Sequence, residues 1–158
     1  MLEALRVADQ FLLDRIVVNQ PMYHMFHRDI ENEVIPFSEQ NGISQIIYSP
    51  LAQGVLSGKY KAGMEYPKGS RAADDSSNMY IAPYLTKDVL TKVERLQGLA
   101  CEQSLTLSQL ALAWVLRHDN VASTIIGASK PEQVLENVKA IGVKLSTETI
   151  DSINKILN

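Results

Sequence analysis

The stretch that decides the fold is ISQIIYSPLAQGVLSGKY, residues 43–60. Its first six residues, Ile43 to Tyr48, form an uncharged and mostly apolar run, which is typical of a strand buried in a parallel sheet. An irregular segment rich in Gly, Ser, Pro and Tyr follows over residues 49–84. Loops of that length inside a compact domain are usually functional or disordered. We therefore expect an α/β protein in which this strand leads into a functional loop.

The other elements lie on either side of this stretch. Short β-branched or apolar runs predict strands over residues 16–20, where Pro21 ends the run, and over 122–126. Pro36 should kink or restart the helix around it, and Gly42 is placed to end that helix. The spacing of apolar residues and the capping signals predict helices over residues 2–14, 30–41, 87–103, 107–118, 130–140 and 147–157.

Capping boxes mark the start of two of these helices. Thr106 and Gln109 have the required spacing before the helix at 107–118. Ser129 and Glu132 repeat that spacing before the helix at 130–140, with Pro131 in its first turn.

Strands that alternate with helices predict right-handed crossovers and a parallel sheet. The helix at 2–14 has no strand before it, and three parallel strands cannot close a barrel. We expect residues 1–158 to form one domain that resembles a section of a larger α/β architecture.

Composition excludes several classes of protein. The chain has 158 residues and a net charge of −3, so it lacks the basic field that nucleic-acid binding needs. No apolar run approaches the length of a membrane helix, and we expect no membrane partner. The single cysteine, Cys101, excludes an internal disulfide framework and a cysteine-built zinc site, which favours a reducing, cytoplasmic compartment. Its apolar neighbours predict that Cys101 fills the core.

Polar loops follow the carboxyl ends of all three predicted strands, which is the ligand-binding face of parallel α/β proteins. The sequence Gly-Ala-Ser-Lys at residues 127–130 ends a strand and opens a helix. Backbone N–H groups and the helix dipole favour an anion there, and Lys130 adds a charge; a cap that serves stability alone explains the same residues.

Other motifs are weaker. Gly54, Gly58 and Lys59 fail the phosphate-loop pattern, because three residues separate the glycines and Tyr60 follows the lysine. His24 and His27 lie near several carboxylates, but the pattern favours a solvated polar turn over a metal site. We expect no metal.

Three separated motifs resemble the aldo-keto reductases, in particular the bacterial branch similar to potassium-channel β subunits. They are QPMY at residues 20–23, YSPLAQGVLSGKY at 48–60, and GAS at 127–129 followed by Gln133, Glu136 and Asn137. The resemblance spans essentially the whole chain but only the C-terminal half of that family. It therefore implies a partial (β/α)8 TIM barrel: the last three βα units with their C-terminal helices.

The resemblance also implies NADP(H) as the cofactor. Gln20 would bond the nicotinamide amide, and Tyr48 would stack on the nicotinamide ring. Ser49, Leu51, Gln53 and Gly54 would line the pyrophosphate, with Ser57, Lys59 and Arg71 completing the clamp. The 2′-phosphate and the adenine would contact the residues that follow the last strand: Gly127, Ser129, Lys130, Gln133, Glu136 and Asn137.

The departures from the family limit the function. The family's catalytic Asp, Tyr, Lys and His belong to the first half of the barrel, so no catalytic residue is assigned here. His24 stands where the family commonly has Asn. The resemblance implies an NADP(H)-dependent oxidoreductase acting on a small carbonyl substrate, with this chain inactive alone. The alternatives are a non-catalytic nucleotide-binding or regulatory module, and a half-barrel completed by a partner chain.

Two strand edges stay open in a three-stranded section. The runs at 16–20 and 122–126 carry no charges to discourage pairing, so we expect a homodimer or larger assembly, or poor solubility. A complementary half-barrel is the alternative partner.

Overall fold

The computed structural model describes residues 1–74, 76 and 78–158. Three strands form one sheet in the order β1-β2-β3, and both pairings are parallel, as predicted. The strands are β1 (Val18–Asn19), β2 (Ser44–Tyr48) and β3 (Val121–Ile125).

β1 is shorter than the run at 16–20 predicts. Only Val18 and Asn19 pair in register with β2, opposite Ser44 and Gln45. The chain stays extended beyond β1, because the Tyr48 N–H donates to the Pro21 carbonyl at 3.1 Å. Pro21 has no N–H of its own to continue a regular ladder.

The described part of the chain also forms six α-helices and five short 3₁₀ helices. The α-helices are α1 (Leu2–Phe11), α2 (Val34–Gln40), α3 (Lys87–Glu102), α4 (Leu107–Val115), α5 (Pro131–Val138) and α6 (Thr147–Leu157). The 3₁₀ helices are η1 (Asp29–Glu31), η2 (Ala52–Ser57), η3 (Arg71–Ala73), η4 (Asn78–Tyr80) and η5 (Ala82–Tyr84).

The predicted helix at 30–41 is two pieces, η1 and α2. Pro36 lies in the first turn of α2, where its missing N–H leaves no bond unmade. Gly42 adopts φ +67° after the helix, and the Ile43 N–H donates to the Ser38 carbonyl at 2.8 Å. This is the left-handed helix ending that glycine favours, so Gly42 ends the helix as predicted.

One predicted capping box forms and the other does not. Thr106 accepts from the Gln109 N–H, and the Gln109 side chain accepts from the Thr106 N–H. At α5 the N-cap is Lys130 rather than Ser129, and no side chain caps the helix. Ser129 instead donates to the side-chain oxygen of Gln133, which is one residue beyond the expected partner Glu132.

The sheet has a covered face and an open face. The covered face carries Gln45 and Ile47, which are fully buried where α2 packs on β2. The register and the alternation along β2 put other residues on the opposite face, which we call the open face. It carries Val18, Ser44, Ile46, Tyr48, Ser123 and Ile125.

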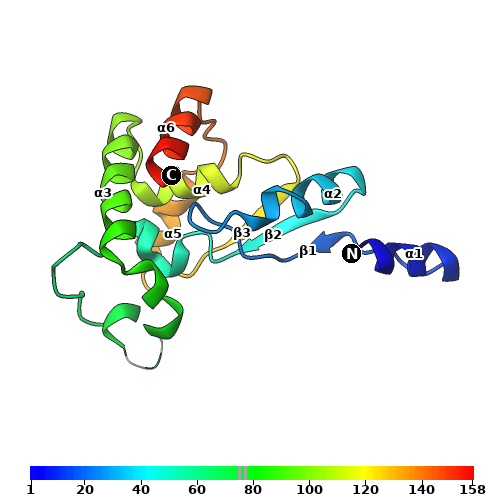
Figure 1. Cartoon of the computed structure of the whole chain (residues 1–158), viewed down its shortest axis with the longest axis horizontal. Helices are drawn as coiled ribbons and strands as arrows, with labels where there is room; N and C mark the ends of the chain where they lie inside the picture. The colour runs from blue at the N-terminus through cyan, green and yellow to red at the C-terminus, as the bar shows by residue number, and fades with distance from the viewer. Residues whose placement is uncertain (75, 77) are drawn as a thin grey trace.

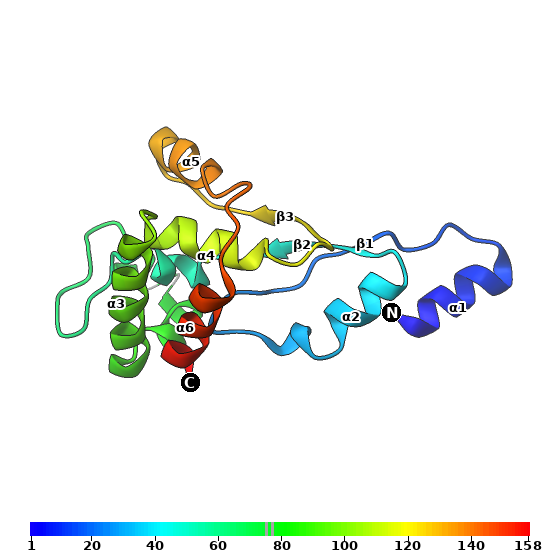
Figure 2. The ribbon, with the colours of Figure 1, turned by 90° about the horizontal axis from the view of Figure 1, so that it is seen from above.

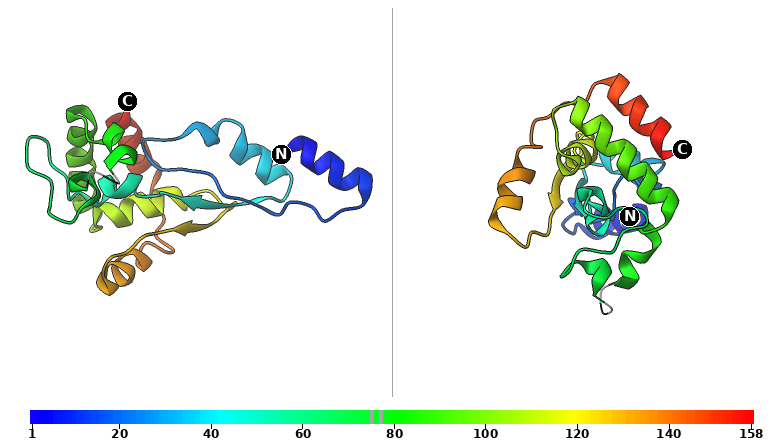
Figure 3. Two further views of the ribbon diagram at one scale, coloured as in Figure 1. Left: turned by 90° about the horizontal axis from the view of Figure 1, so that it is seen from below. Right: turned by 90° about the vertical axis from the view of Figure 1, so that its left-hand side faces the viewer.

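The molecule is elongated. α3, α4 and α6 gather at one end of the sheet and α1 lies at the other end (Figure 1). α5 projects to one side of the molecule and contacts the other helices through α4 (Figures 2 and 3). The core lies between α3, α4, α6 and η2, and it includes Trp114, Leu110, Leu96 and Ile153.

Cys101 does not belong to the core. The thiol was expected there but is exposed, because α3 buries the face of Val93, Leu96 and Ala100. No helix among the described residues is long and apolar enough to span a membrane.

Candidate functional site

The loops after the three strands meet at the carboxyl edge of the sheet. Tyr48 pairs with Ile125 of β3 on one side and bridges to Met22 on the other, so the loops that carry Gln20, Ser49 and Gly127 lie side by side. Gln20 is exposed, and 42% of Tyr48 is accessible. An accessible ring at the end of a strand is free to stack on a planar ligand.

The turn after β2 holds an unusual backbone. Ser49, Ala52 and Gln53 adopt φ of 59°, 47° and 58°, and Gly54 follows at 95°. Left-handed conformations cost energy for residues with a Cβ, and such residues cluster at functional sites. The half-buried Leu51 anchors the turn, because its carbonyl accepts the N–H groups of Gly54 and Leu56.

Side chains of this turn form one connected cluster, which we call the cationic turn: Ser49, Gln53, Gly54, Ser57, Lys59 and Arg71. The Gln53 amide donates to the Ser49 hydroxyl and accepts from the Arg71 guanidinium. The Ser57 hydroxyl donates to the Gly54 carbonyl at 2.7 Å.

Lys59 completes the cationic turn from above Gly54. A Cβ at Gly54 would lie 3.4 Å from the Lys59 Cε and Nζ atoms, in ordinary van der Waals contact, so the end of the Lys59 side chain lies beside Gly54. The ammonium also lies 5.1 Å from the centre of the Tyr60 ring. Two cations, a hydroxyl and an amide at one strained turn are donors that suit an anion.

A second polar group lies at the start of α5. The Ser129 N–H donates to Gln133 Oε1 at 2.8 Å, and Lys130 and Gly127 are exposed beside it. α5 therefore begins with an exposed lysine at its N-terminus, where the helix dipole favours negative charge.

The end of α5 is tied to α4. The Gln109 amide donates to the Glu136 carbonyl at 3.0 Å and to its carboxylate at 2.8 Å. A hydrogen bond from Lys139 lowers the pKa of Glu136. Asn137, in the same part of α5, is 9% exposed. Among the described residues no hydrogen bond joins this group to the cationic turn, so the predicted site residues form two groups along the edge.

His24 corrects the interpretation of residues 24–27 as a solvated turn. It is fully buried, and its Nδ1 atom accepts from the Phe26 N–H at 3.2 Å. Its Nε2 atom therefore carries the proton and donates to the Tyr84 hydroxyl, 3.1 Å away. Burial, with a smaller contribution from His27, lowers the pKa of His24 to about 3. The described residues contain no group of three potential metal ligands.

Sequence analysis also missed the contact between Tyr84 and the carboxyl edge. Tyr84 is half-buried, and its pKa is raised by burial and by the nearby Tyr48 hydroxyl. η5 thus extends the long loop back to the end of β2. No local pattern reveals this, because His24 and Tyr84 are sixty residues apart.

A partly buried ion cluster includes the Tyr23 hydroxyl. Its hydroxyl donates to Glu31, which also accepts from Arg117 at 2.6 Å and Arg28 at 2.8 Å. Arg117 stacks 3.8 Å from the centre of the Trp114 ring. Burial alone would raise the pKa of Glu31, but the bonds from Arg28, Tyr23 and Arg117 outweigh it and lower that pKa. In the sequence, this cluster is indicated only by Arg28, which lies three residues before Glu31.

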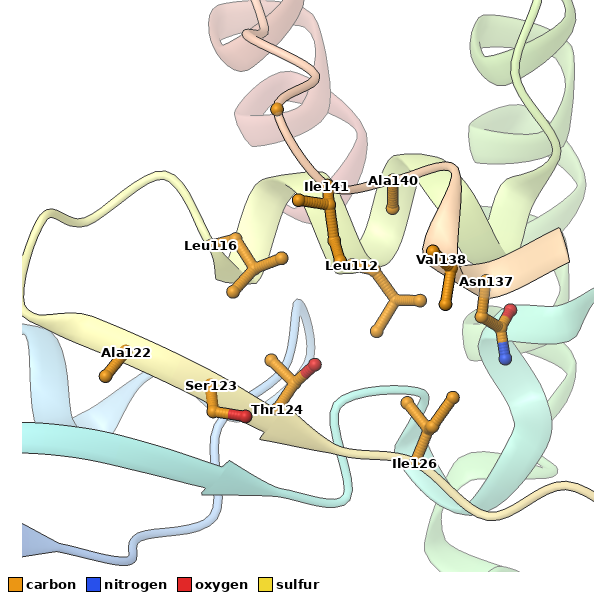
Figure 4. Close-up of a pocket in the computed structure, with 11 residues that line it drawn as sticks. Leu112, Leu116, Ala122, Ser123, Thr124, Ile126, Asn137, Val138, Ala140 and Ile141 are labelled. Atoms are coloured by element: carbon orange, nitrogen blue, oxygen red, sulfur yellow. The ribbon is translucent and has the colours of Figure 1, made fainter. Parts of the chain in front are cut away.

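An apolar pocket of about 400 Å³ opens between β3, α4 and α5 (Figure 4). Leu112 of α4 and Leu116, just after α4, face Ile141 and Val138 across it, and Asn137 supplies an amide. Asn137 is the only predicted site residue that lines this pocket among those described.

Comparison with known proteins identifies relatives of this chain. A plant protein of Arabidopsis thaliana, named as a probable voltage-gated potassium channel subunit beta, is 40% identical over 98% of this chain. The rice protein of the same name is 39% identical, and a putative subunit of Schizosaccharomyces pombe is 38% identical. The alignments cover 45–48% of these relatives, so the chain spans about half of their length.

A solved structure gives the same relation. The glycerol dehydrogenase of Gluconobacter oxydans superposes with a TM-score of 0.76 at 25% identity, covering 93% of this chain and 44% of the dehydrogenase. The three parallel strands thus match part of a larger barrel. The model of the aldo/keto reductase family matches residues 3–158. The chain belongs to the aldo/keto reductase family.

Proposed function

We propose that this chain is the C-terminal, cofactor-binding half of an NADP(H)-dependent aldo/keto reductase barrel. The cationic turn is the observation that carries the proposal: Gln53 links Ser49 to Arg71 beside Lys59, at the carboxyl edge of the sheet. The match of the aldo/keto reductase family to residues 3–158 supports the proposal, as does the coverage of about half of the relatives' length.

The residues fit a dinucleotide at two places along the edge. The donors of the cationic turn, with Leu51 supporting them, would hold the pyrophosphate. Tyr48 and Gln20 would contact the nicotinamide, where an exposed ring and an exposed amide follow two adjacent strands. The start of α5 would hold the 2′-phosphate and adenine through Gly127, Ser129, Lys130, Gln133, Glu136 and Asn137.

When bound, the dinucleotide supplies a hydride for reducing a carbonyl group. The residues of this chain bind and orient it, and none is assigned as the proton donor. Tyr23 is unsuited to that role, because burial raises the pKa of its hydroxyl and Glu31 holds its proton. We assign the donor and its neighbours to the half of the barrel that this chain does not span.

Titration of the purified chain with NADPH tests the proposal. Binding followed by calorimetry is expected, and it should weaken when Arg71→Gln and Lys59→Gln are combined, because two charges facing the pyrophosphate are lost. Lys68→Gln and Lys61→Gln form a matched control, since both lysines are exposed outside the cationic turn. Failure of the wild-type chain to bind NADPH at millimolar concentration would reject the assignment.

A second candidate is a non-catalytic nucleotide-binding module. The names of the relatives favour it, since they describe channel subunits rather than enzymes. NADPH binding without turnover, measured in the presence of a complementary half-barrel, would support this candidate over the reductase.

The proposal includes a completing partner and a compartment. The chain acts in a reducing cytoplasm, where the exposed Cys101 stays a thiol. Its open sheet edges are covered either by a second copy or by a complementary half-barrel.

A further inference from the structure

A tight turn at the carboxyl edge encloses a histidine that the proposed function does not use. Met22 bridges in parallel to Tyr48 at the end of β2. Just beyond this bridge, the backbones of His24 and His27 exchange two hydrogen bonds, of 3.2 and 2.8 Å. His24 is fully buried in the turn. It therefore lies close behind the bridge that fixes Tyr48 at the edge.

The hydrogen bonds of His24 determine which of its ring nitrogens carries the proton. The Phe26 N–H donates to Nδ1 at 3.2 Å, so the neutral ring has its proton on Nε2. Nε2 donates that proton to the Tyr84 hydroxyl oxygen, 3.1 Å away. Because the oxygen of Tyr84 is the acceptor, its own hydrogen points elsewhere. The described residues supply no acceptor for that hydrogen.

Tyr84 comes from the far end of the long loop and packs on the turn after β1. The rings of Tyr84 and His24 meet edge to face with centroids 5.1 Å apart, and the Phe26 ring lies 6.4 Å from the Tyr84 ring. Burial and then the nearby Tyr48 hydroxyl raise the pKa of Tyr84, which agrees with a position beside the exposed Tyr48 ring. The loops after β1 and β2 thus meet at Tyr84.

We propose that His24 is a positioning residue, which holds the Tyr84 hydroxyl at the nicotinamide end of the site so that Tyr84 donates a hydrogen bond to the carboxamide oxygen of the bound dinucleotide. The inference rests on the proposed function, in which Tyr48 stacks on the nicotinamide ring. The carboxamide oxygen is the acceptor that this ring offers, because the ring nitrogen is bonded to the ribose. Gln20 would accept from the carboxamide N–H groups.

A purely structural role explains the burial of His24 but not the hydroxyl of Tyr84. The ring contacts with His24 and Phe26 would hold a phenylalanine equally well at position 84. The side chain of Tyr84 is only half-buried, so its hydroxyl is a donor that a ligand can reach. His24 fixes the direction of this donor before a ligand binds, which reduces the entropy lost on binding.

Calorimetric titration of the full chain with two probes tests the role of Tyr84. NADPH contains the nicotinamide, whereas 2′,5′-ADP has the adenine and the 2′-phosphate without it. We expect Tyr84→Phe to raise the dissociation constant of NADPH at least ~5-fold, about the value of one hydrogen bond, and to leave that of 2′,5′-ADP within about twofold. Tyr80→Phe is the matched control on an exposed tyrosine of η4 and should change neither.

Equal weakening of both probes by Tyr84→Phe would overturn the proposal, because it would show a structural effect on the whole site. Unchanged NADPH affinity in Tyr84→Phe, with NADPH bound by the wild-type chain, would reject this inference alone. Failure of the wild-type chain to bind either probe would reject the proposed function and this inference with it.

Variants of His24 test whether it acts through Tyr84. His24→Leu removes the donor and should weaken NADPH but not 2′,5′-ADP, whereas His24→Gln keeps an N–H near the place of Nε2 and should retain most of the affinity. In a Tyr84→Phe background, His24→Leu should cause no further loss, because both changes remove the same contact. Additive losses would contradict the positioning role.

Nitrogen NMR of the chain without cofactor tests the geometry independently of binding. We expect the His24 ring to show the neutral tautomer with its proton on Nε2, and the Nε2 signal to shift in Tyr84→Phe, where the acceptor is missing. A proton on Nδ1 would overturn the proposal even in a chain that binds NADPH.

Discussion

Gln53 is the residue that joins the separate pieces of the candidate site. One end of its amide contacts Ser49, next to β2, and the other contacts Arg71, eighteen residues further along the chain. The motif at 48–60 contains Gln53 and Ser49, so sequence could place them in one loop. The hydrogen bond between Gln53 and Arg71 depends on how the residues between them fold, and no local sequence pattern predicts that.

Lys130 should determine which dinucleotide is preferred. Lys130→Glu is expected to weaken NADPH binding at least ~10-fold while changing NADH binding little, because only NADPH carries the dianionic 2′-phosphate. Calorimetric titration with both cofactors measures this, and Lys155→Glu on α6 is the control for net charge. Equal losses for NADPH and NADH would remove Lys130 from the phosphate site.

His24 should make the fold sensitive to acid. Its pKa is about 3 in the folded chain and about 6.5 when unfolded, so the unfolded state binds more protons between these values. The stability that neutral His24 contributes is complete above pH ~6.5 and declines as the pH falls toward ~3. The expected loss between pH ~6.5 and ~4.5 is about 2 kcal/mol.

Urea unfolding at both pH values measures that loss. His24→Asn cannot titrate, so its stability should fall by about 2 kcal/mol less over the same interval. His118, whose pKa is lowered by burial and by Arg117, titrates in the same direction and remains in both proteins. A loss of equal size in both proteins would contradict the role of His24.

At the scale of elements, sequence predicted the first residues of α1, α3, α4 and α6, whereas each strand differs from its predicted bounds by one or two residues at an end. β2 and β3 lie within one residue of their apolar runs, because burial on a packed face requires that run. α5 starts differently from its motif, because Gln133 competes with Glu132 for Ser129. The burial of His24 was unpredictable, since its partner Tyr84 comes from a distant 3₁₀ helix.

The two expected capping boxes give a matched comparison. Thr106→Ala should cost about 1 kcal/mol of unfolding free energy, because the side chain accepts from the Gln109 N–H. Ser129→Ala should cost only a few tenths of a kcal/mol, about the value of an exposed substitution, since Ser129 caps nothing. Urea denaturation of both variants measures this, and equal costs would show that Ser129 stabilises α5 after all.

At the scale of the whole molecule, the comparisons establish the family, whereas the identity of the half rests on motif positions. Sequence predicted the parallel sheet and its open edges, because alternating elements allow few other topologies. The exposure of Val134, Leu135 and Val138 on α5 had no sequence signal, since the apolar face of α5 looks like that of any packed helix.

The chain alone should not reduce carbonyl compounds. With NADPH and a generic aldehyde we expect no turnover, because general acid catalysis typically contributes 10²–10⁴-fold and this chain carries no assigned donor. Absorbance of NADPH at saturating aldehyde measures it. Turnover within tenfold of a typical ~10 s⁻¹ would contradict the missing donor and locate one among these residues.

The left-handed backbone at Ser49, Ala52 and Gln53 has a consequence for the thermodynamics of recognition. Folding alone holds these residues in place, through the Leu51 carbonyl and the buried Ala52, Val55 and Leu56 beneath them. The turn is therefore ordered before any anion binds, and binding does not require a flexible loop to become ordered. Preorganised donors lose little conformational entropy on association, so a modest set of contacts here suffices for useful affinity.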